Sequence, residues 1–94
     1  MQIELSPSSR STKKWMVKID NRTIHFGQRG YSDYTVHKDP IRRAAYIARH
    51  AKRENWSDPY TPGFWSRWLL WEKPSMKAAI SNIERKFKIN IVTT

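Results

Sequence analysis

The sequence lacks cysteine altogether and is poor in acidic residues, in glycine and in long apolar runs. Without cysteine the chain can form no disulfide, no thiolate nucleophile and no cysteine-based metal site. No stretch approaches the roughly 20 apolar residues that a membrane-spanning helix needs. The first dozen residues also lack the apolar segment of a signal peptide. These absences exclude a disulfide-stabilised scaffold and predict a soluble protein without a membrane span.

The shortage of acidic residues leaves a large positive charge. Eight Asp and Glu stand against 18 Lys and Arg, which gives a formal net charge of +10. Such a surplus predicts long-range attraction to polyanions. Nucleic acid is the usual partner of so basic a chain, and an anionic membrane or an acidic protein surface are the alternatives. The 94 residues make one domain with a barely sufficient core and little room for a large enclosed cavity.

The chain divides into a polar arm and one basic domain. Residues 1–13 are rich in Ser and bury too little to offset ordering, so they are predicted to be a flexible N-terminal arm. Residues 14–94 are predicted to form a single α+β domain, in which two to three helices pack on a small antiparallel sheet. The expected elements are a β-hairpin at 14–26, helices at 41–54, 63–71 and 75–87, and a closing strand at 88–92 that pairs with the hairpin.

The helix expected at 41–54 is one-sided in charge. Five Lys and Arg residues and no acid lie between residues 42 and 53. The alternative is that this face only contacts solvent, but such faces tend to carry acidic residues that pair with the basic ones. The imbalance favours phosphate binding, and the absence of any base-reading motif predicts little sequence selectivity. The candidate nucleic-acid-binding residues are Arg42, Arg43, Arg49, Lys52, Arg53 and, from the loop after the hairpin, Arg29.

A second face of the same helix is apolar but narrow. Its side chains are mostly alanine, which suits a close approach to another element of the fold. We therefore expect this stripe to pack against the rest of the domain. Its members are Ile41, Ala44, Ala45, Ala48 and Ala51.

Aromatic residues are concentrated in the segment 64–71. Three of the five tryptophans recur there at a spacing of three, and so much aromatic surface has to be buried, either in the core or against a partner. A small domain needs large side chains for its core, so core packing is favoured over partner docking or base stacking. The core or docking candidates are Phe64, Trp65, Trp68 and Trp71, and further stacking candidates are Tyr31, Tyr34 and Tyr60.

No residue pattern in the chain predicts catalysis. The three histidines lie on separate expected elements without the spacing of metal ligands. Gly27 and Gly30 flank Arg29, but the segment lacks the Gly-Lys-Ser/Thr ending of a phosphate-binding loop. No serine lies in a nucleophile motif. We predict a non-enzymatic protein with no metal, no cofactor and no small-molecule substrate.

A series of short motifs covers most of the chain from residue 14 to residue 87. They are His25-Phe26-Gly27, Gly30-Tyr31-Ser32-Asp33-Tyr34-Thr35, His37-Lys38-Asp39, Arg49-His50, Trp56, Gly63-Phe64-Trp65, Trp68-Leu69-Leu70-Trp71 and Lys73-Pro74-Ser75. Together they resemble a family of small basic proteins from nucleocytoplasmic large DNA viruses of algae and protists and from related giant viruses. The resemblance implies no catalytic residues. It implies a virus-encoded protein found in the virion and in the cytoplasm or nucleus of the infected cell.

Two functions fit these observations. The function that we predict is that of a structural virion protein whose basic face binds nucleic acid and helps package or tether the viral genome. DNA is the favoured type of nucleic acid. The alternative is a minor capsid protein that cements capsid subunits through its arm and its Trp-rich surface. The Arg-rich helix favours the first function, whereas the arm and the surplus of aromatic residues favour the second.

Overall fold

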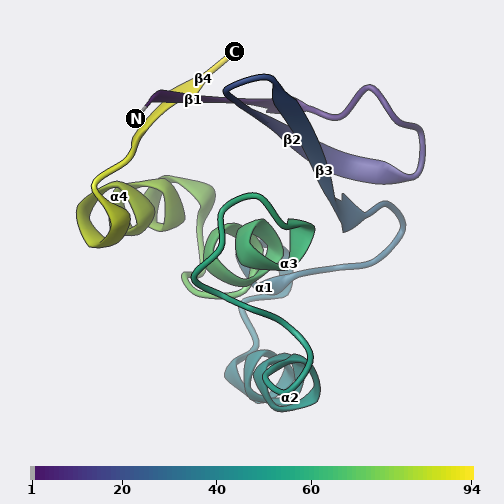
Figure 1. The fold of residues 1–94 in the computed structure, drawn as a ribbon. Coiled ribbons are helices and arrows are strands. Elements are labelled where there is room, and N and C mark those ends of the chain that lie inside the picture. Colours follow the sequence, from purple (N-terminus) through teal and green to yellow (C-terminus); the bar gives the residue numbers. More distant parts are fainter. Residues whose placement is uncertain (1) are drawn as a thin grey trace.

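A four-stranded sheet with helices on one face forms the protein, which the computed structural model describes over residues 2–94 (Figure 1). The predicted α+β class is confirmed. In chain order the elements are β1 (Gln2–Pro7), β2 (Lys13–Ile19), β3 (Arg22–Gln28), α1 (Tyr34–His37), α2 (Pro40–His50), α3 (Pro62–Trp65), the π-helix η1 (Ser66–Leu70), α4 (Met76–Phe87) and β4 (Asn90–Thr93).

The strands of the sheet lie in the order β3-β2-β1-β4. The hairpin forms as predicted from β2 and β3, with Val17 opposite Ile24. The closing strand β4 also forms, but it pairs with β1 and runs parallel to it, with Ile3 opposite Ile91. The prediction of an antiparallel sheet is therefore wrong at this pair. Along the sequence, all the helices lie between β1 and β4. This long connection allows the two strands to pair in the same direction.

The segment predicted to be a flexible arm contains the inner strand β1, so that prediction is wrong for residues 2–7 (Met1 lies outside the described residues). β1 pairs antiparallel with β2 on one side and parallel with β4 on the other. Ile3 and Leu5 alternate with polar neighbours and are 0% and 2% exposed. Two alternating apolar side chains suffice for a strand when both neighbouring strands are in place. The domain therefore includes β1 and does not begin at residue 14.

Three of the helices begin directly after a residue whose side chain caps them. Asp39, Thr61 and Ser75 each accept a hydrogen bond from a backbone N–H two or three residues further on. α2 ends at His50 rather than at residue 54, because the chain turns at 51–53. The aromatic helix forms as α3 followed directly by η1. Within residues 2–94, no helix has the length and apolar character needed to cross a membrane.

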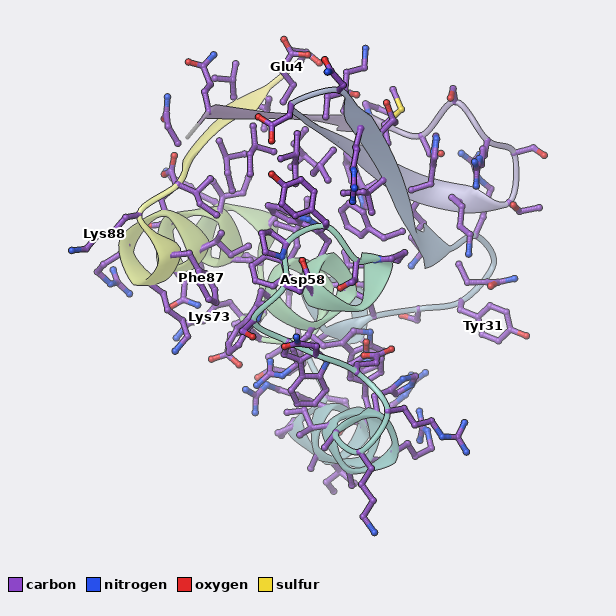
Figure 2. All side chains as sticks on the ribbon, viewed as in Figure 1. Glu4, Tyr31, Asp58, Lys73, Phe87 and Lys88 are labelled. Carbon is purple, nitrogen blue, oxygen red and sulfur yellow. The ribbon has the colours of Figure 1, made fainter. Side chains whose placement is uncertain are left out.

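The core lies between the sheet and the layer of α3, η1 and α4, where side chains from both layers meet (Figure 2). The aromatic residues of α3 lie at its centre, since Phe64 and Trp65 are fully buried and Phe26 of β3 faces Trp65 with ring centroids 6.2 Å apart. The buried members of the core are Ile3, Leu5, Val17, Ile19, Ile24, Phe26, Phe64, Trp65, Leu69, Leu70, Ala79, Ile83, Ile89 and Ile91.

Helix α2 stands apart from the sheet, with α1 and α3 between them (Figure 1). Tyr46 is its buried residue, and the ring of Tyr46 stacks on that of Trp71. The expected packing of the alanine stripe is wrong, because Ile41 is 79% exposed and the four alanines are exposed as well. The side chain of Tyr46 is long enough to reach Trp71, whereas an alanine methyl group is too short to bridge the same gap. The helix therefore docks through Tyr46 and leaves its alanine stripe largely in solvent.

Candidate nucleic-acid interface

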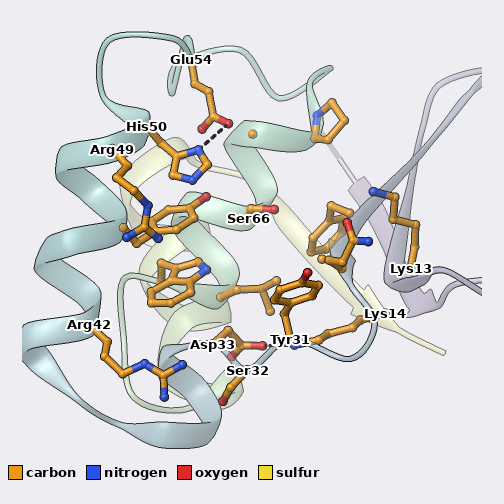
Figure 3. Close-up of a pocket in the computed structure, with 18 residues that line it drawn as sticks. Lys13, Lys14, Tyr31, Ser32, Asp33, Arg42, Arg49, His50, Glu54 and Ser66 are labelled. Carbon is orange, nitrogen blue, oxygen red and sulfur yellow. Dashed lines mark hydrogen bonds and ion pairs between the residues drawn. The ribbon is translucent and has the colours of Figure 1, made fainter.

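A cleft of about 560 Å³ separates α2 from the open end of the β2–β3 hairpin (Figure 3). Lys13 and Lys14 line it from β2, and Arg42 and Arg49 line it from α2. The two arginines are seven residues apart, which is about two helical turns, so they share one face of α2. The cleft therefore has basic side chains on two facing walls.

The basic residues of the cleft differ in whether the protein neutralises them. Lys14 Nζ lies 2.8 Å from Oδ2 of Asp33, and Asp33 is buried. In the part of the chain that the structure describes, Lys13, Arg42 and Arg49 form no salt bridge. Their positive charge is therefore available to an anion that enters the cleft.

His50 and Glu54 lie at one end of the cleft. Nδ1 of His50 is 3.3 Å from Oε1 of Glu54, and the indole N–H of Trp56 donates to Oε2 of Glu54 at 2.8 Å. A Cβ atom on Gly63 would lie 2.8 Å from the carboxyl carbon of Glu54, so glycine lets α3 begin close to this group. The carboxylate is thus engaged by neighbouring side chains, and 36% of the His50 side chain is exposed.

Tyr46 and Trp71 support the wall that α2 forms. The two rings are parallel within 1°, with centroids 4.3 Å apart, and the imidazole of His50 stacks on Tyr46 at 4.2 Å. Burial raises the pKa of Tyr46, so its hydroxyl stays protonated throughout the physiological range. The protein itself therefore covers both faces of the Tyr46 ring, and this stack holds α2 in place.

Arg43, a predicted phosphate-binding residue, makes its contacts within the protein. Its Nε donates to the carbonyl oxygen of Trp71 at 2.9 Å, and its Nη2 lies 2.5 Å from Oε1 of Glu72. The same carboxylate oxygen accepts a hydrogen bond from Nη1 of Arg67 at 2.7 Å. Arg43 therefore anchors α2 to the segment after η1, while its sequence neighbour Arg42 faces the cleft.

The other three predicted binding residues lie outside the lining of the cleft. Arg29 follows β3 directly, is exposed and donates from Nη2 to the carbonyl oxygen of Lys13 at 3.3 Å. Lys52 and Arg53 are exposed in the turn after α2. The structure thus brings two of the predicted residues, Arg42 and Arg49, together with Lys13 of β2.

Arg67 is a key residue of the neighbouring structure that sequence reasoning missed. It is 8% exposed, and its guanidinium carbon lies 4.5 Å from the ring centroid of Trp68 and 5.1 Å from that of Trp56. A buried cation needs such partners and a counterion, here Glu72. The available signal was a single arginine inside the aromatic run. Arg67 binds that run to Trp56 and to Glu72.

The aromatic candidates are thus distributed between the core and its margin. Phe64 and Trp65 are fully buried, and Trp65 donates from Nε1 to the carbonyl oxygen of Pro59 at 2.7 Å. Trp68 is half-buried and donates to the carbonyl oxygen of Trp56 at 2.7 Å. Trp71 is half-buried and stacks on Tyr46. All four rings therefore contact the protein itself.

Replacing Glu72 with Gln is expected to destabilise the protein by about 3 kcal/mol at neutral pH, because Arg67 and Arg43 lose their common counterion. Burial by itself would raise the pKa of Glu72, but hydrogen bonds and charge from Arg67 and Arg43 hold it below the ordinary value. A lowered carboxyl pKa adds stability above the unfolded-state pKa, and this stability is lost as pH falls through the folded-state pKa.

Urea unfolding at several pH values tests this expectation. The wild type should lose stability below the ordinary Glu pKa of 4.5 more steeply than Glu72→Gln does. Glu4→Gln, at an exposed position of β1, serves as the control and should follow the wild type. If the free energy of unfolding falls equally steeply at acid pH in the wild type and in Glu72→Gln, the assigned role of Glu72 would be contradicted.

Residues 3–50 match a family of unknown function (DUF5754). The match spans just over half of the 94-residue chain. The chain belongs to this family. The matched part runs from β1 to the end of α2, so it includes the hairpin and both arginines of the cleft. Neither the curated proteins nor the solved structures include a significant match to the chain.

Proposed function

We propose that the protein binds nucleic acid, largely without sequence specificity, through the cleft between α2 and the hairpin. The observation that carries this proposal is the placement of Lys13, Arg42 and Arg49. These cations lie on two facing walls of one cleft and, among residues 2–94, none of them has a salt-bridge partner. A phosphate backbone supplies closely spaced anions that can be held from both sides.

The acidic side chains that line the cleft do not cancel this charge. Asp33 forms a salt bridge with Lys14 and accepts hydrogen bonds from Thr35. Glu54 is held by His50 and Trp56. Glu54 keeps its negative charge, but four Lys and Arg side chains line the cleft against these two carboxylates, so the net charge of the lining is positive. A cleft lined by one sign of charge concentrates ions of the opposite sign.

We also propose a viral context, which is supported by the resemblance to small basic proteins of large DNA viruses. In that context the protein is a non-enzymatic structural component of the virion, its ligand is the viral DNA, and its role is to package or tether the genome. It would be present in the virion and in the cytoplasm or nucleus of the infected cell.

A role as capsid cement is the second candidate, but it has less support. It required a free arm, whereas residues 2–7 form the inner strand β1. It also required exposed tryptophans, whereas the aromatic run is buried or half-buried. The observation that still favours a protein partner is the apolar stripe of α2, where Ile41 is 79% exposed and its alanine neighbours are largely uncovered.

A salt titration tests the proposed function. Binding of the purified protein to DNA of unrelated sequences should be tight at about 50 mM salt and should weaken steeply towards about 300 mM. Three to five phosphate contacts predict a log–log slope of about −3 to −5. Weak binding at the lowest salt would overturn the proposal and direct the search for partners to capsid proteins.

A further inference from the structure

The Phe, Tyr and Trp side chains that line the cleft are Phe26, Tyr31, Tyr46 and Trp71. Phe26 is 1% exposed, and Tyr46 and Trp71 stack on one another. Tyr31, in contrast, is 69% exposed. Figure 3 shows Tyr31 between the walls formed by α2 and by the hairpin. Among the lining residues, Tyr31 thus presents an aromatic ring that a ligand can stack against.

The shape of the cleft also bears on the form of nucleic acid that it can accept. Its volume of about 560 Å³ falls within the range of roughly 300–1,000 Å³ that is usual for small-molecule sites. A recess of this size can receive one base, but the bases of a duplex stay stacked inside the helix unless they are flipped out. The outer surface of a duplex would meet only the rim of the cleft.

We infer that the cleft receives an unpaired nucleotide, so that single-stranded nucleic acid is the preferred ligand of this protein. This inference rests on the proposed function and names the class of nucleic acid. The base stacks on Tyr31, while Lys13 holds the backbone from one wall and Arg42 and Arg49 hold it from the other. Stacking on a tyrosine ring accepts every base, which agrees with binding of low sequence selectivity.

Fluorescence anisotropy at about 50 mM salt tests the inference with four labelled ligands of equal length, about 12 nucleotides. They are a thymidine strand, a uridine strand, a duplex, and a DNA strand whose bases are replaced by abasic linkers. The thymidine and uridine strands distinguish a DNA ligand from an RNA ligand. The abasic strand keeps the phosphates and removes the groups that would stack. We expect the wild type to bind the better of the two base-bearing strands at least about 10-fold more tightly than the duplex or the abasic strand.

Variants at Tyr31 complete the test. Tyr31→Ala should weaken binding of the base-bearing strand by roughly 5- to 100-fold, because one stacking contact is lost. It should leave binding of the abasic strand and the salt slope unchanged, since no phosphate contact is removed. Tyr31→Phe keeps the ring and should bind like the wild type. Val36→Ala truncates another exposed apolar side chain, which does not line this cleft, and should also bind like the wild type.

The two proposals fail in different ways. Equal binding of the base-bearing strands, the abasic strand and the duplex would overturn the inference and leave the proposed function intact. The inference alone is also overturned if Tyr31→Ala binds the base-bearing strand as tightly as the wild type does. Failure of every ligand to bind at low salt would overturn the proposed function and this inference with it.

Discussion

A chain shortened to begin at Ser8 is expected to be unfolded. The deletion removes β1, which lies between β2 and β4 in the sheet, so both neighbours lose their hydrogen-bonding partner. It also removes the buried side chains of Ile3 and Leu5. Each such loss costs about 2–5 kcal/mol, and the total stability of a small domain is about 5–15 kcal/mol. The deletion therefore removes most or all of the free energy that keeps the chain folded.

Circular dichroism and proton NMR of the shortened chain check this expectation. The loss of cooperative melting and of dispersed amide signals is the expected result. The matched control replaces two exposed residues of the same strand, Gln2 and Glu4, with Ser and keeps the buried pair. This control should melt close to the wild type. If the shortened chain instead melts cooperatively near the wild-type temperature, the first residues would be the dispensable arm that their composition suggests.

Reversal of charge at Arg42 and Arg49 together is expected to weaken nucleic-acid binding by about 100-fold at roughly 0.1 M salt, since each phosphate contact contributes about a factor of ten under these conditions. The slope of the salt dependence should fall by about two. Stability should change little, because both side chains are exposed and neither has a salt bridge in the described part of the chain.

The control for this prediction is the pair Lys52→Glu and Arg53→Glu. It changes the net charge by the same amount, at exposed positions just beyond α2 that do not line the cleft. If the binding site lies in the cleft, the control variant should lose much less affinity for nucleic acid than the variant with reversed charges at Arg42 and Arg49. Equal losses in the two double variants would mean that net charge alone governs binding, and the cleft would have no special role.

The local features of the fold were the predictable ones. The hairpin follows from the alternation around Val17 and Ile24 and from the turn at Asp20, where φ is 54°. The start of α2 follows from Asp39 followed by Pro40. Such signals lie within a few residues of the structure that they predict. The sequence does not predict β1, because this strand buries only Ile3 and Leu5 and one of its two partners is β4, which is far away along the chain.

The arrangement of the site depends even more on distant contacts. Arg42 and Arg43 are adjacent in the sequence, yet one faces the cleft and the other binds Glu72. Successive residues of a helix point about 100° apart, so the rotation of α2 decides these roles. That rotation depends on the stacking of Tyr46 on Trp71. No pattern within α2 reveals this, because an alanine face and a tyrosine face can each serve as the packing surface until the partner is known.

The parallel pairing of β1 with β4 has a consequence for the chain during its synthesis. β1 leaves the ribosome early and can pair with β2 soon afterwards, but its other edge stays open until residues 90–93 have been made. An unpaired strand edge is a template for association with other nascent chains. The four-residue strand β4 therefore closes this edge of β1 only after the helices have been synthesised.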